Sequence, residues 1–164
     1  MKRSIYWLGA GIGILLLLVT AAYAGEEDVP LDKVPKPVME AVKARFKDAE
    51  MTSAAKEKDD EGKLVYELSL KVEGQNVDVI LAPEGEFRVI EKTIDAKNLP
   101  HAVAKALEDK YPKATYNRLE EVIKVEGKND QPAYYEALVT AKKRNIEVEL
   151  TADGKIVKEK DASD

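Results

Sequence analysis

The chain has 164 residues, of which 45% are hydrophobic and 35% are charged, and it contains no cysteine. These proportions are typical of one ordinary globular domain or two small ones, and they exclude disulfide bonds, cysteine catalysis and thiolate metal sites. The formal net charge of −5 disfavours nucleic acids and anionic membrane surfaces as partners, because both are negatively charged.

Residues 1–24 have the features of an export signal peptide. Lys2 and Arg3 give a positive start, an uncharged apolar run follows, and Ala22-Tyr23-Ala24 fits the small-x-small cleavage rule. We therefore predict cleavage between Ala24 and Gly25 and a periplasmic or secreted mature protein, with a net charge of −7 because two basic residues leave with the signal. The alternative is an uncleaved anchor, since the uncharged stretch up to residue 25 is about long enough to span a bilayer. In either case this segment is the only predicted contact with a membrane.

The remaining chain divides into two repeats with short flanking segments. Residues 25–30 are predicted to be a flexible acidic linker, and residues 161–164 a C-terminal tail. Residues 31–95 and 96–160 are predicted to be two copies of one unit. A unit of this size buries too little apolar surface to be robust alone, so we expect the copies to pack together.

An amphipathic helix is predicted near the start of each repeat. Segment 34–46 reappears as 99–111, and apolar residues recur every fourth position in both copies. This spacing places the apolar residues on one face of a helix. Prolines stand at the start of both segments, where the missing N–H group has no intrahelical partner to lose. For the second helix, Asn98 is the predicted N-cap.

Four antiparallel strands are predicted to complete each repeat. Apolar and polar residues alternate in segments 64–72, 77–81 and 87–89, and again in 135–141, 146–150 and around Ile156. The first strand of each repeat alternates poorly and is predicted near residues 49–58 and 114–125. The predicted fold class is α+β, with a helix covering one sheet face in each repeat. The two sheets can join edge to edge as one eight-stranded antiparallel sheet, which would protect their edges.

The two copies differ in length after the helix. Their match resumes at an offset of 69 residues instead of 65, with Gly85 aligned to Gly154 in the last turn. We expect the four extra residues of the second copy in the hairpin loop 127–132, because insertions in surface loops leave a fold intact.

The second repeat carries a pattern found in a known family. The run Leu99-Pro100-x-x-Val103-x-x-Ala106-Leu107-x-x-x-Tyr111-Pro112-x-Ala114, then Tyr135-Glu136 and a strand ending near Asp153-Gly154, resembles the PepSY-like family of beta-lactamase-inhibitor-like domains, which are small exported bacterial proteins. The resemblance spans residues 31–159, and the first repeat departs from the pattern at Phe46-Lys47, where Tyr-Pro is usual. It implies a tandem fold similar to the beta-lactamase inhibitor protein, a role in inhibiting or modulating peptidases or other envelope proteins, and no catalytic residues.

No catalytic, cofactor or metal site is predicted. His101 is the only histidine, and we interpret it as an exposed residue in the first helical turn, so neither a Ser-His-Asp arrangement nor a zinc site is expected. The alternative to a non-enzymatic binding module is a small-ligand or cation carrier that binds calcium with acidic loops, at Asp59-Asp60-Glu61 or in residues 127–131. A hydrolase driven by paired carboxylates ranks last, because nothing in the sequence brings two carboxylates into a cleft.

A partner-binding face is predicted on the side of the sheet that the helices leave uncovered. If Leu64, Tyr66 and Leu68 face the helix, the apolar residues between the facing positions point to the other side. They are Val65, Ile80, Tyr134 and Leu138, and also Ile90 if its strand keeps its register. An open sheet face is ordinarily polar, and tyrosine is a common anchor of interfaces, so we predict that a protein or peptide outside the cytoplasm binds there. The alternative is that these residues are scattered exposed apolar side chains without a function.

Overall fold

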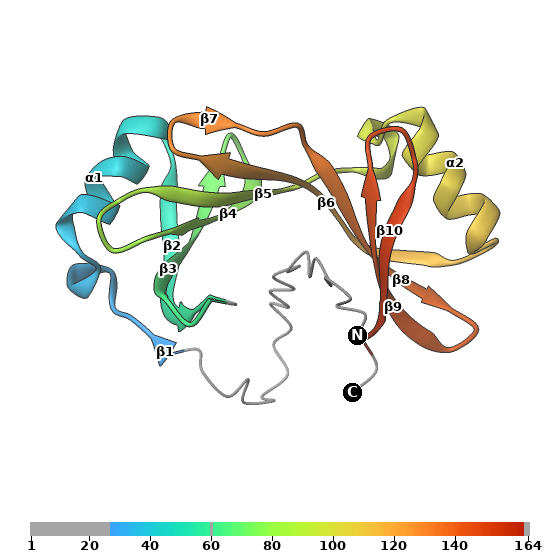
Figure 1. Ribbon diagram of the computed structural model, residues 1–164, viewed down its shortest axis with the longest axis horizontal. Coiled ribbons are helices and arrows are strands. Elements are labelled where there is room, and N and C mark those ends of the chain that lie inside the picture. The colour runs from blue at the N-terminus through green and yellow to red at the C-terminus, as the bar shows by residue number, and fades with distance from the viewer. Residues whose placement is uncertain (1–26, 60, 163–164) are drawn as a thin grey trace, which may run out of the picture.

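A computed structural model describes residues 27–59 and 61–162 and shows two helix-and-sheet repeats built on one sheet (Figure 1). The predicted signal peptide, its cleavage site and the alternative membrane anchor lie outside the described residues. Within the described part of the chain, no helix has both the length and the apolar character needed to cross a membrane.

Each repeat consists of a short 3-10 helix, an α-helix and four long strands. The first repeat comprises η1 (Leu31–Lys33), α1 (Lys36–Arg45), β2 (Glu50–Lys58), β3 (Leu64–Val72), β4 (Gln75–Leu81) and β5 (Phe87–Thr93). The second comprises η2 (Ala96–Asn98), α2 (His101–Lys110), β6 (Thr115–Glu126), β7 (Asn129–Asp130), β8 (Tyr134–Ala141), β9 (Arg144–Thr151) and β10 (Ile156–Asp161). The predicted helix-then-strands order is confirmed, including the poorly alternating first strands.

Two local predictions are wrong. The acidic segment expected to be a flexible linker contains β1 (Glu27–Asp28), which pairs antiparallel with β2, and the Val29 N–H donates to the Ala54 carbonyl at 2.9 Å. Asn98 is not the N-cap of α2, because it ends η2 and the helix begins directly after Pro100. The proline fixes φ at −53°, and its extended ψ of 139° turns the chain from η2 into the helix without a side-chain cap.

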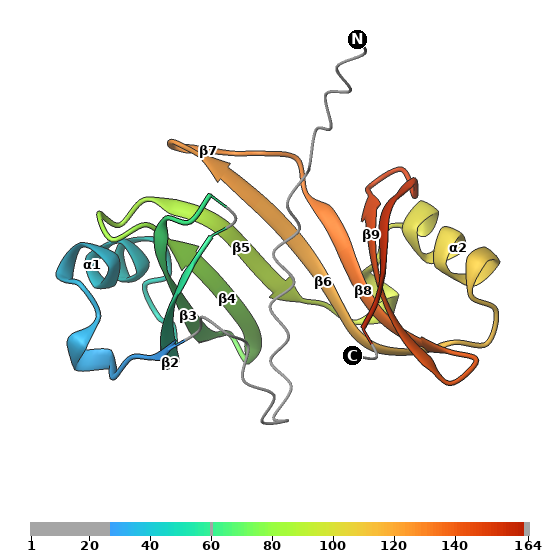
Figure 2. The ribbon, with the colours of Figure 1, turned by 60° about the horizontal axis from the view of Figure 1, so that its bottom comes forward.

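The strands form one antiparallel sheet in the order β1-β2-β3-β4-β5-β6-β8-β9-β10, with β7 attached to β6. The repeats join where β5 pairs with β6, from Val89 opposite Lys124 to Thr93 opposite Glu120. Edge-to-edge joining of the repeats is therefore confirmed. The sheet is strongly curved, and α1 and α2 lie on its outer side at opposite ends (Figures 1 and 2).

Each helix covers its own apolar core, and strand β6 contributes to both cores. Val38 and Val42 of α1 are fully buried against β3 and β4, whereas α2 packs on β8 and β9. Leu119, near the start of β6, belongs to the second core, but Ile123 and Val125, near its end, pack in the first. The core of the first repeat is thus completed by a strand of the second.

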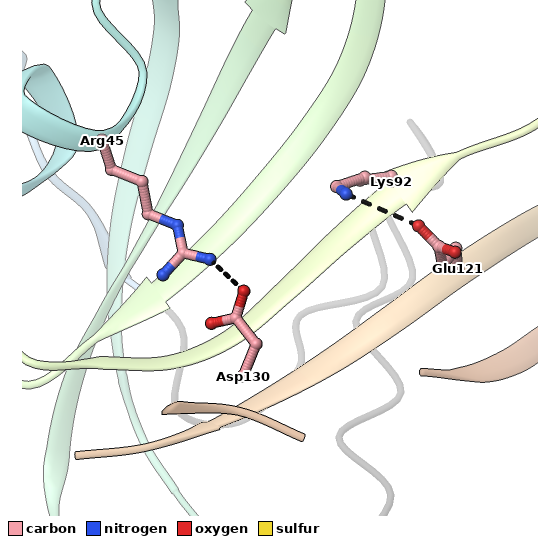
Figure 3. A network of polar contacts seen from close by, with 4 residues as sticks. All are labelled: Arg45, Lys92, Glu121 and Asp130. Atoms are coloured by element: carbon pink, nitrogen blue, oxygen red, sulfur yellow. Dashed lines mark hydrogen bonds and ion pairs between the residues drawn. The ribbon is translucent and has the colours of Figure 1, made fainter. Parts of the chain in front are cut away.

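The hairpin at residues 127–132, where the second repeat has its extra residues, reaches the helix of the first. Asp130 in β7 accepts a 2.6 Å hydrogen bond from the guanidinium of Arg45 in α1, and a 3.5 Å ion pair joins Lys92 of β5 to Glu121 of β6 (Figure 3). The Arg45 guanidinium also lies 5.0 Å from the centre of the Phe87 ring. The insertion therefore ties the two repeats together on the helix side of the sheet.

The two glycines aligned between the repeats, Gly85 and Gly154, both stand in a turn that only glycine fits well. Gly85 and Gly154 have φ of +86° and +83°, in the turns before β5 and β10. A Cβ on Gly85 would lie 2.5 Å from the Pro37 carbonyl oxygen, and one on Gly154 would overlap the Ala102 carbonyl oxygen. Glycine is needed because the turn both adopts a left-handed conformation and touches the first turn of the helix.

Candidate functional site

The side of the sheet opposite α1 and α2, which we call the inner face, is its concave side, and neither of the two α-helices in residues 27–59 and 61–162 covers it (Figure 2). Because directly paired residues on neighbouring strands point to the same side, the register identifies the residues of this face. From β3 to β9 they are Val65, Glu67, Ser69, Asp78, Ile80, Val89, Glu91, Thr93, Arg118, Glu120, Val122, Lys124, Tyr134, Glu136, Leu138, Glu147, Glu149 and Thr151.

An apolar cluster lies in the middle of the inner face. Val65, Ile80, Val89 and Val122 are buried in it, and Tyr134 packs against them partly exposed. We call these five residues the apolar cluster. The Lys124 ammonium lies 5.3 Å from the centre of the Tyr134 ring, so a cation covers one side of the only aromatic residue in the cluster.

The structure brings together three of the residues predicted for this face and separates two. Val65, Ile80 and Tyr134 are members of the apolar cluster. Leu138 lies on the inner face at a distance from them, opposite Arg118 on β6 and Glu147 on β9.

The prediction that Ile90 lies on this face is wrong, because Ile90 packs in the core beneath α1 instead of on the inner face. The pairing of β4 with β5 shifts between Ile80 opposite Val89 and Leu81 opposite Phe87. This irregularity lets Phe87 and Ile90 both face the helix side and turns Val89 to the inner face. Simple alternation along β5 therefore gives the wrong side for Ile90.

Buried carboxylates surround the apolar cluster, and none of them was among the residues predicted for this face. Glu67, Glu91, Glu120 and Glu136 have exposed fractions of only 3 to 4%. Acid faces acid across the strands, since Asp78 is opposite Glu91 and Glu136 is opposite both Glu120 and Glu149. In the sequence these glutamates occupy polar positions of alternating strands, which is the pattern of a solvated side. Only the pairing register of the strands shows that these glutamates lie close together on the inner face.

Few cations balance these acids. Arg118 forms an ion pair with Glu120 at 3.1 Å, and Lys158 forms one with Glu149 at 2.8 Å. Within residues 27–59 and 61–162, no ion pair reaches Glu91 or Glu136, and the Oε1 atom of Glu136 is buried without a hydrogen-bond partner. The surroundings of the apolar cluster are consequently rich in carboxyl groups and poor in cations.

Burial changes the protonation of these carboxyl groups. Burial, followed by repulsion from the nearby Glu120, Glu136, Glu67 and Asp78, raises the pKa of Glu91 to about 9. Burial, followed by repulsion from Glu147, Glu149 and Glu120, raises the pKa of Glu136 to about 8, against the opposing effect of Arg118. The pKa of Glu120 is also raised by burial, although Arg118 opposes the shift. At neutral pH, Glu91 and Glu136 therefore hold their protons in the unbound protein.

The acidic loops considered for calcium have structural roles. Asp59 Oδ1 accepts hydrogen bonds from the N–H groups of Glu61 and Lys63, at 2.9 and 2.8 Å, and Asp130 is bound to Arg45. Asp60 lies outside the described residues. In the part of the chain that the structure describes, no group of three or more His, Cys, Asp or Glu side chains could hold a metal ion. His101 is exposed at the start of α2.

Comparisons with known proteins agree with this architecture. The PepSY-like family model, described as "putative beta-lactamase-inhibitor-like, PepSY-like", matches twice, over residues 23–89 and 74–158. The two matches fit a tandem repeat. Among curated proteins, no relative matches the sequence.

Three solved structures from Bacteroides share the fold. A "putative periplasmic" protein from Bacteroides eggerthii has a TM-score of 0.67 at 15% identity, with 79% of this chain and 90% of that chain covered. A DUF2874 family protein from Bacteroides ovatus has a TM-score of 0.65 at 18% identity, covering 84% and 92%. A BLIP-like protein from Bacteroides fragilis has a TM-score of 0.62 at 17% identity, covering 83% and 89%. At such identities the likeness is one of fold.

Proposed function

The chain belongs to the PepSY-like family of beta-lactamase-inhibitor-like domains, and we propose that it is an exported, non-enzymatic module that binds a protein or peptide partner on its inner face. The observation that carries this proposal is the apolar cluster on the sheet face opposite α1 and α2, the two α-helices of the described part of the chain. Export is supported by the signal-like residues 1–24 and by the periplasmic description of the similar Bacteroides eggerthii structure.

The composition of the inner face is suited to holding another protein. Tyr134 presents a ring beside buried aliphatic side chains, and charged residues such as Lys124 and Glu149 lie around them. Interfaces commonly place aromatic anchors in a desolvated centre and polar residues at the rim. A non-enzymatic role is supported by the exposed position of His101, which leaves no histidine base at this face.

Within this role we propose inhibition or modulation of an envelope protein, for example a peptidase. Support comes from the description of the family and from the fold shared with the BLIP-like protein of Bacteroides fragilis. A curved sheet with its helices on the outer side offers a concave surface to a partner, which suits blocking of another protein's surface better than chemical conversion of a small substrate.

Affinity capture from the native envelope tests the proposal. The bait is the protein expressed with its own N-terminal segment, as wild type and with Tyr134→Asp or Leu138→Asp on the inner face. Val157→Asp serves as the control, because Val157 is an apolar residue of the edge strand β10 with an exposed fraction of 52%. We expect proteins captured by the wild type and the control to be lost with the inner-face variants. Equal capture by all four baits would show that the inner face is not the binding surface.

The alternative role, calcium or small-ligand binding by the acidic loops, is tested by calorimetric titration with calcium. Saturable heat that disappears in Asp130→Asn would favour the alternative over the protein-binding role.

A further inference from the structure

The inner face combines apolar contact with an excess of buried acid. Six strands that follow one another in the sheet each contribute a carboxylate: Glu67, Asp78, Glu91, Glu120, Glu136 and Glu149. Ionised carboxylates directly opposite each other on neighbouring strands are destabilising, so this arrangement opposes folding whenever these groups carry charge. The apolar cores beneath α1 and α2 lie on the other side of the sheet, and these carboxylates take no part in them.

The cations on this face are already engaged at its margins. Arg118 pairs with Glu120, Lys158 pairs with Glu149, and Lys124 lies over the ring of Tyr134. They leave the central Glu136 with one buried oxygen that has no hydrogen-bond partner in the described structure. A buried acceptor without a donor costs about 1–3 kcal/mol, and a donor brought by a partner would remove this cost.

We propose that the partner segment seated on the inner face carries lysine or arginine side chains, which pair with Glu91 and Glu136 while its apolar side chains contact the apolar cluster. The inference rests on the proposed binding role of this face and names the chemistry of the partner. Charge complementarity is its basis, because Glu91 and Glu136 form no ion pair within the described residues. Ammonium and guanidinium groups are the protein donors that satisfy carboxylates most strongly, and on binding them Glu91 and Glu136 release their protons to solvent.

A metal ion fits this face less well than a cationic side chain. The carboxylates stand on separate strands, about 4.8 Å apart between neighbours, and among the described residues they form no group that could hold a metal. A small polyamine would satisfy the acids but would leave the apolar cluster without a contact. A segment of protein that combines basic and apolar residues matches both parts of the face.

Selection from a displayed library of random dodecapeptides tests the inference. The immobilised target is the protein expressed with its own N-terminal segment, and the selected peptides are then titrated against variants. The test variant is Glu91→Gln with Glu136→Gln, which removes the charges and preserves shape. The matched control is Glu108→Gln, an exposed glutamate on α2. Circular dichroism checks that every variant is folded.

We expect the selected peptides to be enriched in lysine and arginine and to bind the double variant at least about thirtyfold more weakly than the wild type and the control. Replacing arginine by citrulline in such a peptide should weaken binding to the wild type but not to the double variant. Peptides without basic enrichment that are lost with Tyr134→Asp would overturn the inference and leave the proposed function standing.

Two other outcomes would also show that the proposed partner chemistry is wrong. If spermidine binds the face as tightly as the peptides, and equally well in Tyr134→Asp, the occupant is a small polyamine and the inference is wrong. If no selected peptide responds to either the double variant or Tyr134→Asp, the inner face does not bind peptides, and both the inference and the proposed function fail.

Discussion

Replacing Glu136 with glutamine is expected to stabilise the unbound protein at neutral and mildly alkaline pH. The side chain is 4% exposed on β8, and burial together with its acidic neighbours raises its pKa from 4.5 to about 8. The folded protein therefore binds this proton more tightly than the unfolded chain does. As a result, the free energy of unfolding falls as pH rises from about 4.5 to about 8. Below this window the group is protonated in both states and costs nothing.

The size of the stabilisation expected for Glu136→Gln follows from the pKa shift of Glu136. Each pH unit inside the window costs about 1.4 kcal/mol for one group, so at pH 7 the linkage lowers the free energy of unfolding by at most about 3.5 kcal/mol. Glutamine keeps the shape of the side chain and cannot ionise. We thus expect Glu136→Gln to be about 1–3 kcal/mol more stable than the wild type at pH 7 to 8, and to differ least at pH 5.

Urea unfolding followed by circular dichroism at pH 5, 6, 7 and 8 measures the effect. Wild type, Glu136→Gln and the exposed control Glu108→Gln are compared at one ionic strength. The gap between the wild type and Glu136→Gln should widen with pH, whereas the control should follow the wild type. Curves that stay parallel across this range would refute the reasoning, because Glu136 would then titrate alike in the folded and unfolded states.

Four further variants test other parts of the structure by chemical unfolding. Gly154→Ala should lower the free energy of unfolding by about 2–4 kcal/mol, because alanine is strained at this positive φ and the new Cβ overlaps a helix carbonyl. Gly62→Ala, at a position with positive φ but open space around it, should lower it by about 1 kcal/mol. Equal losses would mean that contact with the helix is unimportant. Val125→Ala should cost about 1–3 kcal/mol and should weaken hydrogen-exchange protection in α1, although it belongs to the second repeat. Protection changed only around α2 would contradict the shared core. Arg45→Ala should cost only about 1 kcal/mol, since its pair with Asp130 is half exposed; a loss above about 3 kcal/mol would show a larger role for this contact.

The repeat and its elements could be predicted because they depend on local periodicity. Apolar residues every fourth position identified both helices, and alternation identified β3, β4, β8 and β9, since side-chain direction along one element follows from its own geometry. The aligned glycines located the last turn of each repeat for the same reason.

The inner face could be predicted only in part because it depends on register between strands. Val65, Ile80 and Tyr134 were identified, but Ile90 was assigned to the wrong side because a shift in the β4–β5 pairing is invisible along either strand alone. The gathering of Glu91 with other acids required knowledge of which residues lie opposite one another. The pairing of β1 with β2 was missed for a similar reason, since a charged segment of two residues has no alternation.

Strand β6 has a consequence for the order in which the molecule can become complete. A chain that crosses a membrane with its N-terminus leading delivers α1 and strands β2 to β5 first, yet the core beneath α1 lacks Ile123 and Val125 until nearly half of the second repeat has followed. An early fragment would therefore have an incomplete core beneath α1. This core would become complete only when the end of β6 emerged, so the last step in packing the first repeat depends on a strand of the second.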